Sequence, residues 1–353
     1  MIIDQFYNIH SLLRVHVRAA ASIIAEVDCH LWAFRSDELH DVDIIIAPYC
    51  DAPKSVPKTV VDDYEFGGGL YRRDAARFAF SYHGSRDAYY MDRLVVPLNL
   101  IVQFALLKKN LTFIHGAGLN FGEEAVIFPA YPGTGKTTLV ATFMRVGAKF
   151  LGDDLCIVGR DAIYSYPQAL SVYPHHLPVL QYSNKHIERA FKRTALLDSL
   201  IRPIERSENA IARLVRFALN RARTPAVNVV PNIVFGANAI ATRGRASRII
   251  SLERAADIVD LSEVPTCLEE LADHAVAVLW HEWHASFHNI LLYDAVAEGG
   301  IGTIKRFLAV RKIVIDSLVG VPCHKVRIPA SWDNATLMER FPPFLESLRR
   351  RGI

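Results

Sequence analysis

The chain has 353 residues, of which 51% are apolar and 22% charged, and its formal net charge is only +3. This composition is typical of a globular protein and excludes a disordered or coiled-coil chain. The small net charge gives no reason to expect a nucleic acid as partner. At this length, one large domain or two ordinary ones can bury a core without disulfides or a structural metal.

The five cysteines lie far apart and form no C-x-x-C pair, which argues against a disulfide framework and against a zinc knuckle. The N-terminus lacks the basic region of a signal peptide, because Asp4 precedes the first arginine, Arg14. The longest apolar stretch, residues 94–107, is shorter than the roughly 20 residues that a membrane-spanning helix needs. We therefore expect a soluble, cytoplasmic protein that does not associate with a membrane.

Residues 1–93 are expected to form a small β-rich domain. Three runs in this part are rich in apolar and β-favouring residues, namely 29–34, 42–47 and 77–82. Polar and glycine-rich turns separate them. Pro97 then suits the first turn of a helix that extends toward Lys109. Residues 94–353 are expected to form a second, larger domain.

Two apolar runs in this second part, residues 113–119 and 125–129, enclose the turn-forming sequence Asn120-Phe-Gly122. This pattern predicts an antiparallel hairpin. The second run leads directly into a glycine-rich segment, residues 130–137. That segment therefore follows a predicted strand.

The segment Ala130-Tyr-Pro-Gly-Thr-Gly-Lys-Thr137 fits the phosphate-binding loop G-x-x-x-x-G-K-[ST], except that alanine replaces the first glycine. In such a loop, backbone N–H groups surround phosphate oxygens, the lysine reaches the β- and γ-phosphates, and the next hydroxyl holds Mg²⁺. A glycine-rich turn without nucleotide is the alternative, but the strand before and the helix after favour phosphate binding. We predict ATP and Mg²⁺ as cofactors. The candidate nucleotide-binding residues are Pro132, Gly133, Thr134, Gly135, Lys136, Thr137 and Thr138.

A pair of aspartates follows the loop. The helix after the loop is expected to end at Gly147, and a short strand, residues 149–151, then leads to Asp153 and Asp154. Because neighbouring residues on a strand point to opposite sides, one carboxylate can hold Mg²⁺ with Thr137 while the other faces the acceptor. A kinase needs both functions. Two aspartates that cap a turn are the structural alternative.

The order of these motifs resembles that of the HPr kinase/phosphorylase family, whose fold is related to the nucleotide-binding part of phosphoenolpyruvate carboxykinases. His115 precedes Lys136 by 21 residues, and Asp153 follows Lys136 by 17. The resemblance covers residues 113–158, with a weaker likeness over 321–328. The chain lacks the Glu-Arg-Gly segment of HPr kinases, so it is more similar to divergent members of the family, some of which resemble enzymes that phosphorylate peptide serines during natural-product maturation.

The resemblance implies an α/β fold with a mixed-sheet P-loop kinase core and a small β-rich N-terminal domain. It also implies that Lys136 and the loop cradle ATP, that Thr137 and Asp153 hold Mg²⁺, that Asp154 is the base and that His115 stabilises the transferred charge. Without the resemblance, His115 is better explained as an ordinary strand histidine. The implied activity is an ATP-dependent kinase that phosphorylates a serine-type hydroxyl of a peptide, protein or small molecule.

Two other functions remain open from the sequence. One is a nucleotide-gated P-loop ATPase or binding protein without a dedicated acceptor. The other is a carboxykinase that acts on oxaloacetate, which depends on shared fold alone. The sequence also leaves open whether the donor is ATP or GTP and whether the chain forms a homo-oligomer.

Residues 185–223 are helical in character and carry ten Lys/Arg against four Asp/Glu, which indicates a basic helical insertion. It could bind an anionic acceptor, with Arg202 and Arg206 as a clamp, or it could be a solvated helix face. The segment Tyr173-Pro-His-His176 is either part of an acceptor cleft or a surface turn.

Strands are expected over 233–237 and 247–252, and helices over 268–290, over 303–318 and at the C-terminus. His281, His284 and His288 fall on one face of the first of these helices. Three imidazoles could bind a metal ion, but the H-E-x-x-H spacing is missing, and an aromatic face packed on the core explains the segment equally well.

Overall fold

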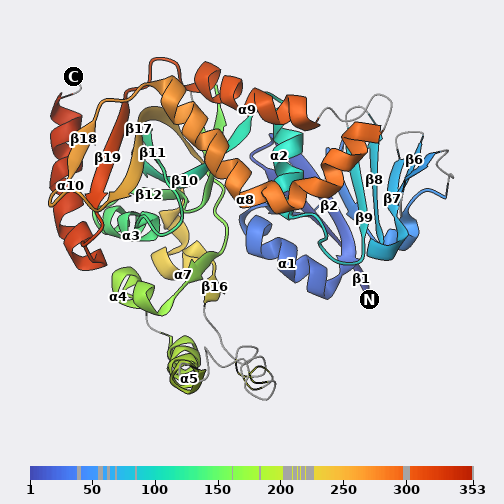
Figure 1. Ribbon diagram of the computed structural model, residues 1–353, viewed down its shortest axis with the longest axis horizontal. Helices are drawn as coiled ribbons and strands as arrows, with labels where there is room; N and C mark the ends of the chain where they lie inside the picture. Colours follow the sequence, from blue (N-terminus) through green and yellow to red (C-terminus); the bar gives the residue numbers. More distant parts are fainter. Residues whose placement is uncertain are drawn as a thin grey trace.

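The computed structural model describes the chain apart from residues 38–40, 55–58, 62–63, 68–69, 84–85, 161, 183, 202–208, 210–212, 214, 216–218, 220–225, 297–302 and 352–353. Two large mixed sheets lie side by side, and helices cover them (Figure 1). The protein therefore has the mixed α/β architecture that the sequence predicts.

The first sheet contains nine strands in the order β3-β1-β2-β4-β9-β8-β7-β6-β5. Their bounds are β1 (Ile2–Ile9), β2 (Leu13–Ala20), β3 (Arg35–Ser36), β4 (Ile44–Ala47), β5 (Thr59–Val61), β6 (Tyr64–Gly67), β7 (Leu70–Arg73), β8 (Phe78–His83) and β9 (Arg86–Met91). Strand β4 is parallel to both of its neighbours, and the other pairs are antiparallel.

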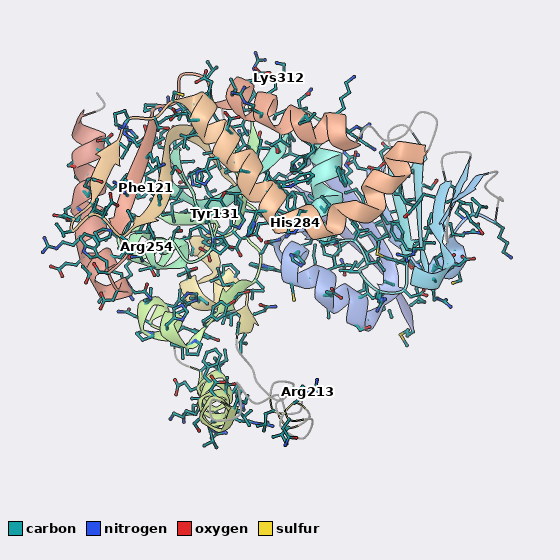
Figure 2. All side chains as sticks on the ribbon, viewed as in Figure 1. Phe121, Tyr131, Arg213, Arg254, His284 and Lys312 are labelled. Atoms are coloured by element: carbon teal, nitrogen blue, oxygen red, sulfur yellow. The ribbon has the colours of Figure 1, made fainter. Side chains whose placement is uncertain are left out.

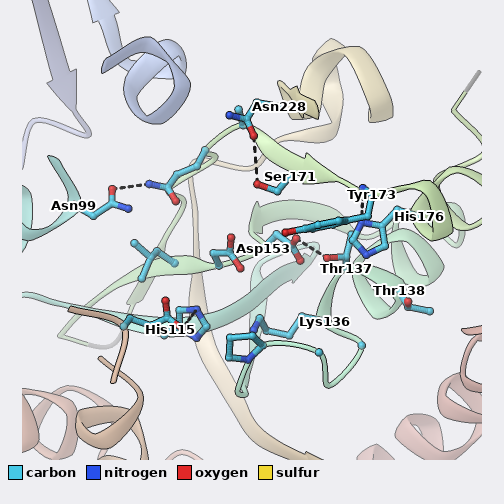
Figure 3. Close-up of a pocket in the computed structure, with 18 of the residues that line it drawn as sticks. Asn99, His115, Lys136, Thr137, Thr138, Asp153, Ser171, Tyr173, His176 and Asn228 are labelled. Atoms are coloured by element: carbon cyan, nitrogen blue, oxygen red, sulfur yellow. Dashed lines mark hydrogen bonds and ion pairs between the residues drawn. The ribbon is translucent and has the colours of Figure 1, made fainter. Parts of the chain in front are cut away.

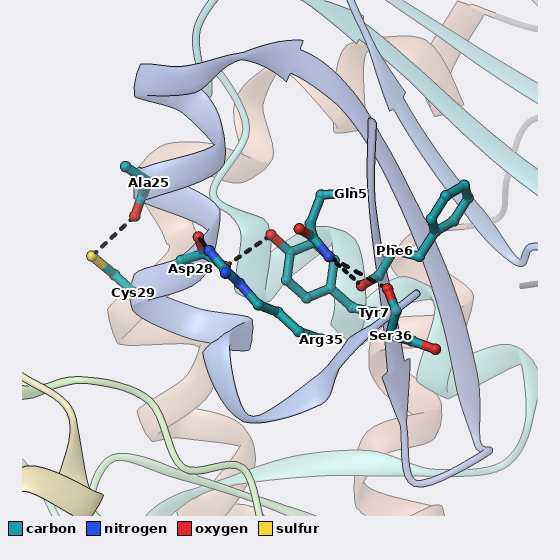
Figure 4. A network of polar contacts seen from close by, with 8 residues as sticks. All are labelled: Gln5, Phe6, Tyr7, Ala25, Asp28, Cys29, Arg35 and Ser36. Carbon is teal, nitrogen blue, oxygen red and sulfur yellow. Dashed lines mark hydrogen bonds and ion pairs between the residues drawn. The ribbon is translucent and has the colours of Figure 1, made fainter. Parts of the chain in front are cut away.

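The predicted strand over residues 29–34 is wrong, because helix α1 (Ala21–Leu31) and the short 3-10 helix η1 (Trp32–Phe34) occupy this part. The buried residues of α1 are Ile23, Ile24, Val27 and Leu31, whose spacing is helical. A polar network fixes α1 on the sheet (Figure 4). In it, Tyr7 donates to Asp28 Oδ1 at 3.0 Å, and Arg35 Nε donates to the same oxygen at 2.8 Å.

The second sheet has eight strands: β10 (Thr112–Phe121), β11 (Glu124–Pro129), β12 (Lys149–Gly152), β13 (Leu155–Gly159), β14 (Ala162–Tyr164), β17 (Arg243–Ala255), β18 (Ser262–Val264) and β19 (Cys323–Pro329). The predicted hairpin of β10 and β11 is confirmed, with Phe121 opposite Glu124. Strand β17 is parallel to both β11 and β19, so the carboxyl ends of these three strands meet at one edge. A small separate sheet pairs β15 (Leu170–Val172) with β16 (Val227–Val229).

The described helices, apart from α1, are α2 (Leu98–Lys108), α3 (Lys136–Arg145), α4 (Leu177–Leu180), α5 (Lys185–Ile201), α7 (Pro231–Phe235), α8 (Leu268–Val296), α9 (Thr303–Leu318) and α10 (Asn334–Arg351). Besides η1, the short 3-10 helices are η2 (Tyr49–Asp51), η3 (Asp74–Ala76), η4 (Pro174–His176) and η6 (Ala237–Ala239). The predicted helices after Pro97 and after the glycine-rich loop are confirmed. The predicted strand over 233–237 is wrong: Pro231 begins α7 and Gly236, at φ 93°, ends it.

Both faces of the second sheet are covered. Along β11, Ala125 and Ile127 pack into one hydrophobic cluster, and Val126 and Phe128 pack into another. The first cluster includes residues of α2, α8 and α9, and the second includes residues of α3 and α10. Burial on both faces explains why β11 is a continuous apolar run.

The first cluster also contains core residues of the nine-stranded sheet, among them Tyr7 and Val15. The two sheets therefore share one hydrophobic core, and a domain boundary between residues 93 and 94 stays a prediction. Helix α5 lies below α4 in Figure 1, and its residues Ile187 and Phe191 belong to the second hydrophobic cluster. It accounts for the basic segment as far as Ile201, whereas Arg202 and Arg206 lie outside the described residues. Among the described helices, none has both the length and the apolar character that crossing a bilayer requires.

Candidate active site

A cavity of about 630 Å³ opens at the edge of the second sheet where β11 ends. Nine of the sequence-predicted site residues line it: His115, Pro132, Gly133, Gly135, Lys136, Thr137, Thr138, Asp153 and Asp154 (Figure 3). The exception is Thr134, whose hydroxyl donates to the Tyr131 carbonyl at 2.9 Å and which lines a neighbouring cavity. The structure thus brings together residues that are up to 39 positions apart in the sequence.

The loop between β11 and α3 requires glycine at Gly135. Its φ is 105°, and a Cβ there would lie 2.6 Å from Leu337 Cδ2 of α10. Helix α3 begins at the next residue, Lys136. The first N–H groups of a helix have no partner within the helix and carry partial positive charge, so this end of α3 suits an anion.

The alanine at the first position of the loop is explained by its backbone. Ala130 is fully buried, forms a parallel bridge with Leu252 and does not have a positive φ, so this position needs no glycine. Its carbonyl oxygen accepts from Lys136 Nζ and from His115 Nδ1, both at 3.1 Å. Ala130 therefore links the lysine and the histidine of the site.

The Lys136 side chain is buried and is held across its own loop, since Nζ also donates to the Tyr131 carbonyl at 3.3 Å. Burial lowers the pKa of Lys136, while the charges of Asp154, Asp153 and Glu282 oppose this effect. The ammonium group is thus surrounded by carboxylates and carbonyls at one end of the cavity.

Thr137 and Asp153 form a direct pair. The Thr137 hydroxyl donates to Asp153 Oδ2 at 2.7 Å, and the other oxygen, Oδ1, is buried without a hydrogen-bond partner among the described residues. Burial, together with the charge of Asp154, raises the pKa of Asp153 to about 7. A hydroxyl beside an unsatisfied carboxylate oxygen is a donor set that suits a hard divalent cation such as Mg²⁺.

Asp153 and Asp154 lie in a bend between β12 and β13, not on a strand as expected. Both line the cavity instead of pointing to opposite sides of a sheet. Glycine is required before them, because a Cβ on Gly152 would lie 2.2 Å from the Leu155 carbonyl oxygen. The Asp154 carbonyl accepts from the Gly116 amide at 2.9 Å, which ties the bend to β10.

His115 projects from β10 into the same cavity. Because Nδ1 donates to the Ala130 carbonyl, Nε2 is the free acceptor, and it lies 4.0 Å from Glu282 Oε1. Burial and the charge of Lys136 lower the pKa of His115, against the opposing charges of Asp154 and Glu282. The imidazole is therefore neutral near pH 7.

Two charged residues of the cavity, Glu282 and Arg254, were not among the predicted site residues. Arg254, labelled in Figure 2, is the penultimate residue of β17. Its Nη1 donates to the carbonyls of Pro329 and Trp332, each at 2.9 Å. Its position after a predicted strand was a usable signal, because ligands bind at the carboxyl ends of parallel strands. No local signal distinguishes Glu282 from its neighbours in α8.

The histidine face of α8 does not form a metal site in the part of the chain that the structure describes. His281 and His284 are exposed, with their rings 6.2 Å apart, and His284 Nδ1 lies 2.8 Å from the His281 carbonyl. His281 also lies near Tyr131, at 6.1 Å between ring centroids. The side chain of His288 is outside the described residues.

The segment 173–176 contributes Tyr173, His175 and His176 to the lining of the cavity, and its contact with an acceptor stays a prediction. Burial, with the charge of His175, lowers the pKa of His176 to about 4. The remaining wall includes Cys29 and His30 of α1 and Asn99 of α2, which no sequence motif indicated.

No family model matches the sequence, and no curated protein is found to be related to it. Among solved structures, the chain is similar to the Hpr(Ser) kinase/phosphatase from Coxiella burnetii, at 10% identity and a TM-score of 0.30. The alignment covers 68% of this chain and 99% of that chain. This is a distant likeness, so the proposal below depends on the cavity itself.

Proposed function

We propose that the protein is a kinase that binds Mg-ATP in this cavity and transfers the γ-phosphoryl group to a hydroxyl. One observation carries the proposal: Asp153 Oδ1 is buried, has no hydrogen-bond partner in the part of the chain that the structure describes, and lies beside the Thr137 hydroxyl in the cavity that also receives Lys136 and Asp154. A buried carboxylate oxygen without a partner is costly unless a ligand satisfies it.

The triphosphate is bound by groups at the loop. The N-terminus of α3 offers backbone N–H groups, and Lys136 offers an ammonium group at the position where the β- and γ-phosphates would lie. Gly133 and Gly135 both have positive φ, at 79° and 105°, a conformation that residues with side chains rarely adopt.

Thr137 Oγ1 and Asp153 Oδ1 are the groups that would hold Mg²⁺. The bound ion supplies charge neutralisation for the β- and γ-phosphates. Because the pKa of Asp153 is raised to about 7, its carboxylate is not fully ionised at neutral pH without such a partner.

In the transfer step, the acceptor oxygen attacks the γ-phosphorus and forms a new P–O bond. The bond between the γ-phosphorus and the β–γ bridging oxygen breaks, and ADP leaves. The hydroxyl proton passes to the carboxylate of Asp154, which is exposed to the cavity. His115 lines the same cavity with a neutral imidazole, so we assign it to orienting the groups of this region and not to carrying charge.

The proposal is tested with purified protein, γ-labelled ATP and an extract of the organism that encodes it. We expect label in a discrete product, loss of nucleotide binding in Lys136→Ala, and retained binding with transfer reduced by about 10²-fold or more in Asp154→Asn. Lys149→Ala, an exposed lysine outside the cavity, is the matched control.

If Lys136→Ala binds nucleotide normally, the loop is not the cradle. If Asp154→Asn transfers label as well as the parent, Asp154 is not the base. Hydrolysis of ATP without any phosphorylated product, accelerated by a macromolecular partner, would instead identify a nucleotide-gated switch.

A further inference from the structure

The cavity has a wall that phosphoryl donation does not use. We call it the acceptor wall, and it is formed by Cys29 and His30 of α1, Asn99 of α2, and Gln168 and Ala169, which precede β15. Figure 3 shows Asn99 and Thr138 on opposite sides of Asp153. In-line transfer places the acceptor opposite the leaving group, so this wall is where the acceptor hydroxyl must approach.

Hydrogen bonds within this wall determine which atoms of three side chains act as donors and which as acceptors. Gln168 Nε2 donates to Asn99 Oδ1 at 2.6 Å and to His30 Nδ1 at 2.8 Å. The Tyr166 hydroxyl donates to the same Asn99 oxygen at 3.2 Å. These bonds use Asn99 Oδ1, Gln168 Nε2 and His30 Nδ1. Among the described residues, the groups that these bonds leave for a ligand are Asn99 Nδ2 as donor, Gln168 Oε1 as acceptor and His30 Nε2–H as donor.

The three side chains are not needed to hold the two parts of the protein together. Trp32 Nε1 donates to the Pro167 carbonyl at 2.6 Å, and the Ala169 amide donates to the Cys29 carbonyl at 2.7 Å. These bonds, with the shared hydrophobic cluster, already attach α1 to the segment before β15. The donor–acceptor–donor array of Asn99, Gln168 and His30 lines the cavity, and binding of a ligand is the simplest explanation for it.

The charges of the cavity indicate what that ligand is. Among the described residues that line it, the cations are Lys136 and Arg254, which the triphosphate would engage. Asp153 would hold Mg²⁺, and two further carboxylates, Asp154 and Glu282, lie close enough to Lys136 for their charges to act on it. Burial lowers the pKa of His30, so this side chain is neutral and adds no positive charge. An anionic acceptor would meet two carboxylates and no cation of its own, which disfavours it.

The acceptor wall is also set back inside the protein. Cys29, His30, Asn99 and Gln168 are half-buried, and Trp283 beside them is 7% exposed. The cavity of about 630 Å³ must hold the end of a triphosphate as well as the acceptor. Its size suits a small molecule.

On the basis of the proposed kinase function, we propose that the acceptor is an uncharged small molecule with several hydroxyl groups, held by Asn99, Gln168 and His30. Hydroxyls both donate and accept, so adjacent ones match the alternating groups of this array. One hydroxyl is presented to Asp154, which receives its proton, while its oxygen forms the new bond to the γ-phosphorus and ADP departs. This departs from the anionic acceptor that the basic segment suggests.

The first experiment separates an extract of the source organism into three fractions: macromolecules, small molecules retained by an anion exchanger, and small molecules that flow through. The full chain is incubated with each fraction and γ-labelled Mg-ATP. Label in a product of the flow-through fraction supports the proposal. Label only in macromolecules, only in the retained fraction, or in none of the three although the protein binds Mg-ATP overturns it. Failure to bind Mg-ATP at all would contradict the kinase function itself.

The second experiment tests the array with the flow-through fraction as acceptor. Gln168→Leu should raise the apparent KM for this fraction at least about tenfold. The acceptor molecule loses Gln168 Oε1, and Asn99 Oδ1 and His30 Nδ1 lose the N–H groups that Gln168 donates to them. The KM for Mg-ATP should stay within about twofold of that of the parent. Gln5→Leu is the matched control, since Gln5 is also half-buried and donates to two carbonyls, but lies outside the cavity (Figure 4).

Asn99→Asp is the second variant, because it keeps the oxygen that accepts from Gln168 and Tyr166 and replaces the ligand-facing donor with an acceptor that also carries negative charge. It should also raise the acceptor KM while Mg-ATP binding persists. An unchanged acceptor KM in both Gln168→Leu and Asn99→Asp would show that the array does not bind the acceptor.

Discussion

Replacement of Asp153 by asparagine should make the protein more stable in the absence of metal while abolishing Mg²⁺-dependent nucleotide binding. One oxygen of the aspartate accepts from the Thr137 hydroxyl, and the other is buried without a partner among the residues that the structure covers. Asparagine has nearly the same shape, can still accept from the threonine hydroxyl and carries no charge to bury. A residue that costs stability when no ligand is bound is expected at a binding site.

The size of the effect follows from the pKa of Asp153, which is raised from 3.8 to about 7. A raised carboxyl pKa means that folding favours the neutral form. The stability that the neutral Asp153 carboxyl provides is therefore fully present below about pH 4, and it is lost as the pH rises through about 7 and the group ionises. With about 1.4 kcal/mol per pH unit, the ionised carboxylate costs about 2 kcal/mol near pH 5.5 and about 4 kcal/mol near pH 8.5.

The assay is urea unfolding of both proteins in EDTA at these two pH values. Asp153→Asn should exceed the parent in free energy of unfolding at both, by more at the higher pH. Asp260→Asn is the control, because Asp260 is exposed and lies outside the cavity. Equal or lower stability of Asp153→Asn at the higher pH would refute the claim that this carboxylate is buried without compensation.

Further predictions concern the loop and the core. Gly122→Ala should lower the free energy of unfolding by about 1 kcal/mol, because φ is 83° although the space around a Cβ is open. Gly135→Ala should cost more than twice as much by urea unfolding, because its Cβ meets α10; equal costs would contradict that close approach. Lys108 Nζ donates to the buried Asp87 carboxylate at 2.6 Å. Lys108→Met should therefore lower the free energy of unfolding by about 3 kcal/mol. The double variant Lys108→Met/Asp87→Leu should recover most of this loss, because no unpaired charge stays buried. No recovery would show that the ion pair is not what the lysine supplies.

The sequence predicted strands β10, β11, β12 and β17 of the second sheet and the loop after β11, because local patterns specify them. It gave no signal for β13, β14 and β18. The hairpin before Ala130, the helix after Gly135 and the cap at Gly147 each have turn or cap residues at fixed positions. The strand predicted over 29–34 was wrong because a short apolar run fits a strand as well as the end of an amphipathic helix. The site residues around Lys136 likewise came from one continuous motif.

The acceptor wall could not be predicted in the same way. His30, Asn99 and Gln168 are separated by 69 residues or more from one another, and each belongs to an otherwise ordinary segment. They meet only because α1 packs against the segment before β15, an arrangement set by tertiary contacts such as that of Trp32 with Pro167. Glu282 is similar, since its position in the cavity depends on where α8 packs against β10. Such residues have no signature in a single sequence.

Calorimetric titration of the purified chain with Mg-ATP tests the central claim most directly. We expect one nucleotide per chain, no binding in Lys136→Ala, and binding that no longer depends on Mg²⁺ in Asp153→Asn. Unchanged Mg-ATP affinity in both variants would show that the triphosphate does not lie between the loop and the aspartate pair.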